Sequence, residues 1–352
     1  MWPSNALTER LNLKWPIIQA PMGSASTPAL AAAVTNAGGL GGLGKWGRTA
    51  GAGGAPNSRF PAAKRGSLNV NYPIWPGPRC APDITEAMQR RLQPHYDAHG
   101  LGPVPEPKGV VSDVGHEHLA LLLETKPEVV SFHFGLPDPD AVQTLKAAGI
   151  FIMSSATTVA EARMLEQSGV NAVIAQGIEA GGHRATFTGI DISMQPGLFS
   201  LLPQMADAVS VPVIAAGGVA DGRTAAAAFM LGANAVQLGT AFLRCEEAEV
   251  GDAHRVALAA ADDACTVVTN VISGRPCRYI HNIMIDDLVA SGLQPLPVPA
   301  QQSLTSPLAA TGNREWTALT SGQSAALATD TNATELVQRI AEETTRRLRA
   351  FA

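Results

Sequence analysis

The chain has 352 residues, a formal net charge of −5, 46% hydrophobic residues and 16% charged residues. This composition is typical of a globular protein with a large buried core, and the lack of basic runs argues against nucleic acid as a partner. Its four cysteines have no CxxC spacing, so neither a metal site nor a disulfide framework is expected. The N-terminus has no continuous apolar core and no apolar run reaches membrane-spanning length, so we expect a cytoplasmic protein without a membrane partner.

Short apolar runs along the chain predict eight buried strands. In chain order they are Pro16–Gln19, Gly39–Gly42, Ser67–Asn69, Val129–His133, Phe151–Ser154, Ala172–Gln176, Val213–Ala216 and Ala235–Leu238. Such continuous runs are typical of parallel strands that are covered on both faces. Helical stretches alternate with them: Thr27–Asn36, Glu117–Thr125, Asp138–Ala148, Thr158–Ser168, Leu198–Ala208 and Thr224–Leu231. Eight alternating units predict an α/β fold, a closed (β/α)8 TIM barrel.

Two regions do not fit the barrel pattern. About 60 residues separate Asn69 from Val129, which is more than a normal crossover needs, so this interval holds an insertion. We expect residues 73–104 and 245–289 to form a cap or substrate region, and residues 1–72, 105–244 and 290–352 to form the barrel. The tail Ala333–Phe351 is expected to be an amphipathic helix packed on the barrel. The Gly/Ala-rich stretch Thr49–Pro56 is either a loop at the mouth or a solvated turn.

The most informative segment is Val173–His183, where a buried strand runs into a glycine-rich turn that ends on a histidine. Loops at the carboxyl ends of barrel strands carry the chemistry of this architecture. Gly181 and Gly182 allow the backbone to approach a flat ligand, and His183 supplies a group that titrates near neutral pH.

Two later segments predict a phosphate site. Gly217-Gly218 follows the seventh strand, and Gln237-Leu238-Gly239-Thr240 spans the end of the eighth strand and the start of a helix. The loops after strands seven and eight of a TIM barrel commonly bind phosphate through backbone N–H groups. One such Gly-Gly could be an ordinary tight turn, but two such loops in tandem favour a phosphate site.

These motifs resemble those of the nitronate monooxygenases, formerly called 2-nitropropane dioxygenases. The matching blocks are Gln19-Ala20-Pro21-Met22-Gly23, Thr27-Pro28, Ala37–Gly41, Ser131-Phe132-His133-Phe134-Gly135, Ala175-Gln176-Gly177, Glu179–His183, Ala216-Gly217-Gly218, Gln237–Thr240, Leu293–Pro297 and Gly322-Gln323. The Ser-Phe-His-Phe-Gly block resembles the corresponding block in the branch of the family that oxidises nitronates. Ala185-Thr186 departs from the family pattern, which usually has a glycine after the His-Arg pair.

The resemblance implies FMN and assigns residues to it. Met22 and Gly23 would lie against the isoalloxazine ring, although Met22 could instead be ordinary core packing. Asn69 and Gln176 would meet the amide-like edge of the ring. By spacing alone Asn71 competes with Asn69, but Asn69 lies nearer the apolar run of the strand.

The glycines and the eighth-strand motif would hold the rest of the cofactor. Gly181 and Gly182 leave room for the ring or ribityl chain. The phosphate would be held by Gly217, Gly218, Gln237, Leu238, Gly239 and Thr240.

His183 is the expected catalytic base, because removal of the α-proton of a nitroalkane suits an imidazole. The alternative is a structural histidine bonded to a turn carbonyl. His133 ends the fourth strand and points to the same mouth, where it either handles substrate or protons or is a satisfied core histidine.

The resemblance implies FMN-dependent oxidation of an alkyl nitronate by O2 to a carbonyl compound and nitrite, in a monomer or homodimer. The substrate is open between propionate 3-nitronate, simple alkyl nitronates and nitroalkanes. A substrate carboxylate would need a cation, for which Arg184, Lys45 and Arg275 are candidates. The alternative function is an FMN-dependent NAD(P)H reductase, of the enoyl reductase or quinone reductase type, and a non-catalytic flavin-binding barrel is a third.

Overall fold

A computed structural model describes residues 5–44, 67–75, 77, 79–109, 114–189 and 191–350. Two features named from the sequence, Lys45 and the stretch Thr49–Pro56, lie outside the described residues, as does Phe351 at the end of the tail.

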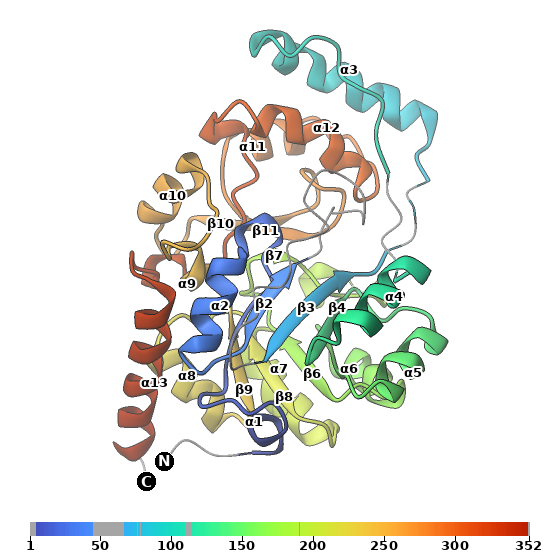
Figure 1. The fold of residues 1–352 in the computed structure, drawn as a ribbon. Coiled ribbons are helices and arrows are strands. Elements are labelled where there is room, and N and C mark those ends of the chain that lie inside the picture. Colours follow the sequence, from blue (N-terminus) through green and yellow to red (C-terminus); the bar gives the residue numbers. More distant parts are fainter. Residues whose placement is uncertain are drawn as a thin grey trace.

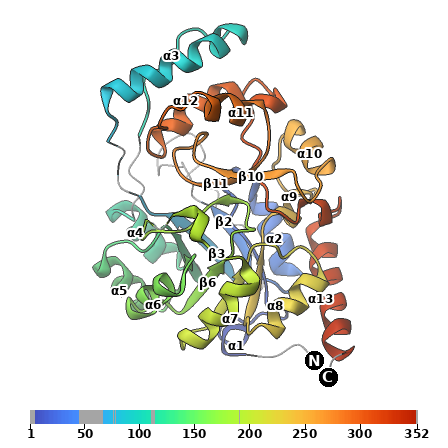
Figure 2. The same cartoon turned by 180° about the vertical axis from the view of Figure 1, so that it is seen from behind.

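Within the described residues, eight parallel strands form one sheet in the order β1-β9-β8-β6-β5-β4-β3-β2. A parallel bridge between Ile18 and Leu40 joins the first and last members of this sheet and closes it into a barrel (Figures 1 and 2). The predicted TIM barrel is therefore confirmed. The strands are β1 Ile17–Gln19, β2 Gly41–Gly44, β3 Leu68–Pro73, β4 Val129–His133, β5 Phe151–Ala156, β6 Ala172–Gln176, β8 Val213–Ala216 and β9 Ala235–Leu238.

The third strand is longer than the sequence predicted. The expectation that it ends at Asn69 is wrong, because β3 continues to Pro73 and pairs with β4 as far as the Pro73–His133 register. The polar Asn71 and the Tyr-Pro pair suggested a loop. In the barrel, however, alternate residues of a strand point inward, where polar groups near the mouth are tolerated.

Helices cover the outside of the barrel, and most begin at a capping side chain. Thr27, Asp138 and Thr158 each accept a hydrogen bond from a first-turn backbone N–H. Such caps satisfy otherwise unpaired donors at a helix start. The helices are α2 Pro28–Asn36, α4 His116–Thr125, α5 Pro139–Ala147, α6 Val159–Gln167, α7 Leu198–Ala208, α8 Gly222–Met230, α9 Thr240–Leu243 and α13 Ala333–Ala350.

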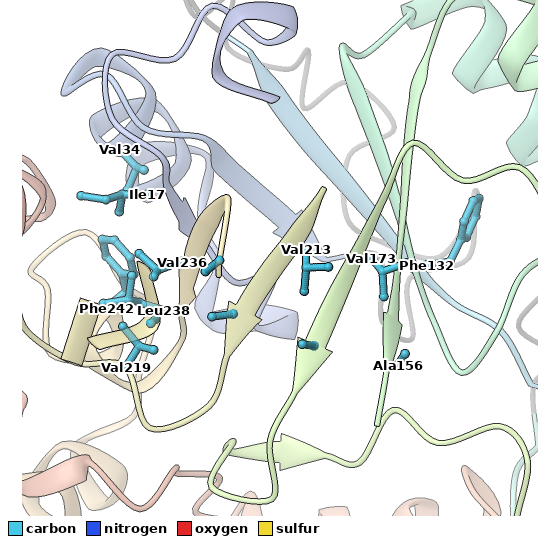
Figure 3. Packing of buried hydrophobic residues seen from close by; sticks show 14 of the residues in the cluster. Ile17, Val34, Phe132, Ala156, Val173, Val213, Val219, Val236, Leu238 and Phe242 are labelled. Atoms are coloured by element: carbon cyan, nitrogen blue, oxygen red, sulfur yellow. The ribbon is translucent and has the colours of Figure 1, made fainter. Parts of the chain in front are cut away.

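Two buried clusters make up the barrel core. One lies between strands and helices and includes Val173 and Val213 from neighbouring strands (Figure 3). The other fills the barrel interior, where Ile174 and Ile214 meet Leu7 from α1 (Ala6–Arg10). Helix α1 therefore closes the end opposite the mouth, and only the carboxyl ends of the strands can hold a site.

A second layer sits over the carboxyl ends of the strands (Figure 1). It contains α3 Pro82–Ala98, α10 Asp252–Ala259, α11 Ile283–Ala290, α12 Ala300–Ala309, and strands β10 Thr266–Thr269 and β11 Cys277–Ile280. Its own apolar core joins Leu92 of α3, Leu288 of α11, Leu304 of α12 and Trp316. We infer that the cap comprises residues 73–104 and 245–316, since a boundary at 289 would divide this core.

Four 3-10 turns connect these elements: η1 Gly23–Ala25, η2 Ile192–Met194, η3 Arg314–Trp316 and η4 Ala325–Leu327. Among the helices that the structure describes, none is both long and apolar enough to cross a membrane.

Candidate active site

The loop after β6 leaves the barrel and joins the cap. Its residues Gly182–His183 form the short strand β7, which pairs antiparallel with β11 in the register His183–Cys277. The Arg184 N–H extends this contact by donating to the Pro276 carbonyl at 2.8 Å. The barrel loop is thereby the edge strand of the cap sheet, and His183 lies on the seam between the two layers.

The imidazole of His183 is oriented by a hydroxyl from the cap. Its Nε2 lies 2.9 Å from the Ser273 Oγ, and this hydroxyl donates to the Arg275 carbonyl at 3.1 Å. Because the Ser273 proton is used in that way, the hydroxyl oxygen accepts from His183 Nε2–H. The neutral ring then carries its basic lone pair on Nδ1.

His133 at the end of β4 contacts the same strand. Its Nε2 donates to the His183 carbonyl at 3.1 Å, since a carbonyl can only accept. The next residue, Phe134, has a φ of 71°, a left-handed conformation that is strained for a bulky side chain. Backbone strain of this kind clusters at functional sites. The Phe134 ring packs edge-on against both His133 and His183.

Burial keeps both histidines neutral. Desolvation, with smaller contributions from the charges of His133 and Arg275, lowers the pKa of His183 to about 3. Desolvation likewise lowers the pKa of His133 to about 4, against the opposing effect of its hydrogen bond to His183. Both imidazoles are therefore unprotonated at neutral pH and have a lone pair for a substrate proton, although the lowered pKa makes each a weaker base than a free imidazole.

Gln176 holds the segment that carries His183. Its Nε2 donates to the His183 carbonyl at 3.0 Å, and its Oε1 accepts from the Ala185 N–H at 2.8 Å. Both amide atoms therefore bond backbone of the β7 segment. Contact between Gln176 and a flavin edge stays a prediction.

The segment after β7 is fixed by a buried carboxylate that sequence reasoning missed. Glu161 of α6 is fully buried and accepts from Thr157, from Thr186 Oγ1 at 2.7 Å and from the Phe187 N–H at 2.8 Å. Burial raises the pKa of Glu161, but these hydrogen bonds outweigh it and keep the pKa below its usual value. No local sequence pattern marks this contact, because Glu161 reads as an ordinary first-turn helix residue.

The two described arginines proposed as partners for a substrate carboxylate have different surroundings. Arg184 is fully buried and donates to the Gln176 and Gly177 carbonyls at 2.8 and 2.6 Å, so it braces the backbone. Arg275 instead lies at the histidines, with its guanidinium carbon 4.0 Å from the centroid of the Phe134 ring.

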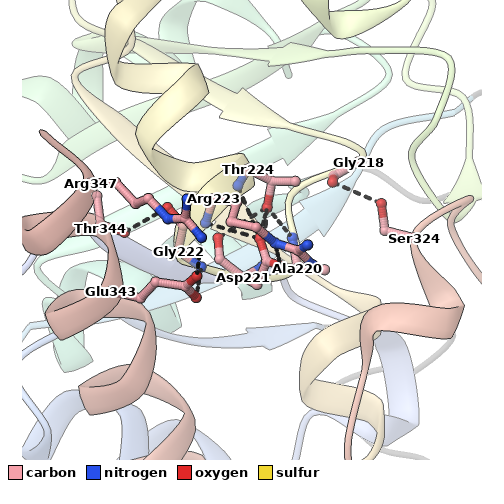
Figure 4. A network of polar contacts seen from close by, with 10 residues as sticks. All are labelled: Gly218, Ala220, Asp221, Gly222, Arg223, Thr224, Ser324, Glu343, Thr344 and Arg347. Atoms are coloured by element: carbon pink, nitrogen blue, oxygen red, sulfur yellow. Dashed lines mark hydrogen bonds and ion pairs between the residues drawn. The ribbon is translucent and has the colours of Figure 1, made fainter. Parts of the chain in front are cut away.

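The two Gly-rich loops are brought together by a segment near the C-terminus. Gly217 and Gly218 have φ of 106° and 72°, which side chains rarely adopt. Ser324 Oγ donates to the Gly218 carbonyl at 2.8 Å (Figure 4). The Gly322 N–H donates to Thr240 Oγ1 at 2.9 Å.

The same segment packs closely against the turn before β7. A Cβ on Gly181 would lie 2.5 Å from the Gly322 nitrogen, so this position needs glycine. The segment 321–324 therefore contacts the turn before β7 as well as the loops after β8 and β9. The sequence had indicated it only as part of the resemblance.

The first helix residues after these loops are held firmly. Asp221 caps α8 by accepting from the Arg223 and Thr224 N–H groups, and Thr224 Oγ1 in turn accepts from the Asp221 N–H (Figure 4). Glu343 of α13 accepts from the Gly222 N–H at 3.1 Å. This network fixes the loop that follows β8.

The loops after β1 and β9 face each other. Met22 is half-buried, and a Cβ on Gly239 would lie 3.7 Å from its Sδ. At Gly23, which has φ of 53°, a Cβ would have no atom within 4 Å. Leu238 is fully buried in the barrel core and contributes its backbone carbonyl to the Ala20 N–H. Gln237 Oε1 is buried without a hydrogen-bond partner among the described residues, which marks a place for a donor from a ligand.

Asn69 and Asn71 lie on the same side of β3 but differ in environment. Asn69 is completely buried, and within the described part of the chain neither of its amide atoms has a hydrogen-bond partner. Asn71 lies two residues nearer the mouth, is 9% exposed and donates to Ser131 Oγ at 3.0 Å. Asn69 does not end the strand, but its two unpartnered amide atoms, like Gln237 Oε1, mark a place for hydrogen bonds with a ligand, whereas the Asn71 amide already bonds Ser131. Contact between either amide and a flavin stays a prediction.

Comparison with known proteins agrees with this geometry. The family model described as "Nitronate monooxygenase" matches residues 4–55 and 101–343. A nitronate monooxygenase of Pseudomonas aeruginosa is 40% identical over 97% of this chain and 99% of its own length, and one of Paraburkholderia phytofirmans is 39% identical over 99% and 98%.

Solved structures are similar as well. The nitroalkane oxidase of Streptomyces ansochromogenes has a TM-score of 0.88 at 36% identity, covering 99% of this chain and all of that one. FabK of Thermotoga maritima has a TM-score of 0.73 at 27% identity, with 99% and 100% covered. The chain belongs to the nitronate monooxygenase family.

Proposed function

We propose that this FMN-dependent nitronate monooxygenase carries out its reaction on the seam between barrel and cap, with His183 as the base. The observation that carries the proposal is a half-buried, neutral imidazole on β7, oriented by Ser273 and adjacent to the glycine loops. Bound FMN supplies the redox chemistry that oxidises a nitronate with O2 to a carbonyl compound and nitrite.

The residues present fit FMN. Gly217 and Gly218 after β8, with Gly239 and Thr240 after β9, would hold the phosphate through backbone N–H groups. Met22 and Gly23 would lie against the ring, and Gly181 and Gly182 would leave room beside it. The unpartnered Gln237 Oε1 supports this placement, because a buried acceptor of this kind needs a donor.

His183 would take the α-proton of a neutral nitroalkane on Nδ1, while Ser273 keeps Nε2 protonated. His133 would act through the strand, since it holds the His183 carbonyl. A nitronate is already deprotonated and needs no base, so for that substrate the seam would only bind and orient the anion.

The first prediction separates proton removal from a neutral nitroalkane and oxidation of a preformed nitronate. His183→Asn should reduce kcat/KM for neutral nitroethane by about 10²–10⁴-fold, the usual contribution of a general base. Oxidation of preformed ethyl nitronate should fall much less. Oxygen uptake with each substrate on flavin-loaded protein measures both, with NADH as a reductase control and His99→Asn, in the cap, as the matched variant. Unchanged nitroethane turnover in His183→Asn would remove it as the base.

The pH dependence follows from the lowered pKa. Because burial moves the pKa of His183 from 6.5 to about 3, the proton-accepting form persists as pH falls below 6.5. The acid limb of kcat/KM for nitroethane should therefore lie well below pH 6.5, as measured between pH 4.5 and 9 by oxygen uptake. An acid limb centred near pH 6.5 would contradict this environment for the base.

The phosphate assignment is tested at Gly218. Gly218→Leu should yield largely colourless protein, since the side chain would occupy the place of the phosphate. A change at a positive φ is strained wherever it occurs, so Gly149→Leu is the control: its φ is 79° and its surroundings are open. Full FMN content in Gly218→Leu, by flavin absorbance after purification, would refute the assignment.

The two asparagines are expected to behave differently. Asn69→Leu should weaken FMN binding by about 10-fold or more, because it removes a buried amide whose two polar atoms have no partner among the described residues and would bond the ligand. Asn71→Leu should change FMN affinity less, because its amide already donates to Ser131. Fluorescence titration of apoprotein with FMN measures the affinities. Selective loss of FMN binding in Asn71→Leu would make Asn71 the contact instead.

A further inference from the structure

The loop between β10 and β11 brings a guanidinium to the two histidines. Arg275 stacks on the Phe134 ring and donates through Nη2 to the Thr186 carbonyl. Its positive charge lowers the pKa of both His133 and His183, which places it within electrostatic reach of both rings.

This cation has donor capacity that the protein leaves unused. Arg275 Nε is buried and has no hydrogen-bond partner among the described residues. Glu161 contributes a favourable charge interaction, but its oxygens accept hydrogen bonds from Thr157, Thr186 and Phe187. A buried N–H donor without an acceptor is costly, so a ligand that supplies an acceptor to Nε gains binding energy.

The neighbouring arginines do not have this character. Arg184 donates to two backbone carbonyls and to Gln195, and Arg278 donates to the Ile178 carbonyl at 2.9 Å and to Thr266. Their donors are occupied in holding the backbone, whereas the Arg275 side chain meets the backbone of the described residues through Nη2 alone.

The loop holds Arg275 firmly in place. Gly274 has φ of 86°, and a Cβ there would collide with the Leu296 carbonyl, so the turn is tightly packed. The Arg275 carbonyl is tied to Ser273, whose hydroxyl also bonds His183. The guanidinium and the imidazole are thus fixed by one three-residue turn, which reduces the ordering cost of binding.

Resting on the proposed function, we propose that Arg275 binds an anionic oxygen of the substrate and is the residue that selects charged over neutral ligands at this site. The shared chemistry is a planar two-oxygen anion. A nitronate group and a carboxylate both have this shape, and a guanidinium binds it through parallel N–H donors.

The test compares Arg275→Met and Arg275→Lys with wild type, all loaded with FMN. Met keeps the packing on Phe134 but removes the charge, and Lys keeps the charge but loses the planar fork. The substrates are ethyl nitronate and a nitronate with a carboxylate two carbons away. The unreactive probes are the anion succinate and the neutral butyramide, and their binding is followed by changes in flavin absorbance. Arg91→Met, which removes an arginine from the cap, is the matched control.

Arg275→Met should raise KM for the carboxylate-bearing nitronate, and Kd for succinate, by about 10–100-fold, with a smaller change in kcat. Arg275→Lys should lie between. If the carboxylate is the bound group, ethyl nitronate and the neutral butyramide are affected much less than their partners. If the nitronate group is bound, KM for both substrates rises equally. Either pattern supports an anion-binding Arg275.

The proposal is overturned if KM and Kd in both variants stay within about twofold of wild type, or if Arg91→Met causes the same change. FMN content and melting temperature show whether a variant has failed to fold. If Arg275→Met fails to fold, Arg275→Lys still tests the proposal. Normal anion binding in Arg275→Met would reject anion binding by Arg275. If His183→Asn still loses nitroethane activity, the proposed function of His183 as the base is unaffected by that result.

Discussion

The pairing of β7 with β11 is the contact on which the site depends. It makes a barrel loop the edge strand of the cap sheet, so one short strand belongs to both layers. His183 lies on that strand, and the turn that precedes β11 supplies Ser273 and Arg275. Backbone pairing of this kind has little freedom of register, because a one-residue slip would turn the imidazole to the other face of the sheet.

The electrostatics of the seam follow from this arrangement. The cap partly shields two half-buried imidazoles from water, and this desolvation disfavours their charged forms. The positive charge of Arg275 acts in the same direction. The result is a site that holds a neutral base beside a fixed cation, which suits a substrate that becomes an anion when it loses its proton. Glu161 fixes the loop after His183 by accepting hydrogen bonds from Thr186 and Phe187.

The fold could be read from the sequence largely because buried parallel strands have a strong local pattern. Four strands have the bounds that the apolar runs predicted: Val129–His133, Ala172–Gln176, Val213–Ala216 and Ala235–Leu238. The third strand failed for a physical reason: Asn71 is polar yet points into the barrel, so the apolar pattern stopped before the strand did.

The site was less accessible to sequence reasoning, because its partners are distant in the chain. Ser273 lies 90 residues from His183, and no spacing rule links them. The same holds for Glu161 with Thr186, and for Ser324 with Gly218. Glycine pairs and a histidine after a buried strand can be recognised locally. A hydroxyl that selects a tautomer, or an arginine that stacks on Phe134, becomes visible only when the cap is folded onto the barrel.

The central claim is that His183 is a neutral, Nε2-protonated imidazole under the cap, and histidine NMR tests it most directly. FMN-loaded protein with ¹⁵N-labelled histidine would be titrated from pH 9 to pH 4.5, with His183→Asn to assign the resonance. The account predicts a protonated Nε2 and an unprotonated Nδ1 across this range, because burial lowers the pKa to about 3. A transition near pH 6.5, or a proton on Nδ1 instead of Nε2, would contradict it.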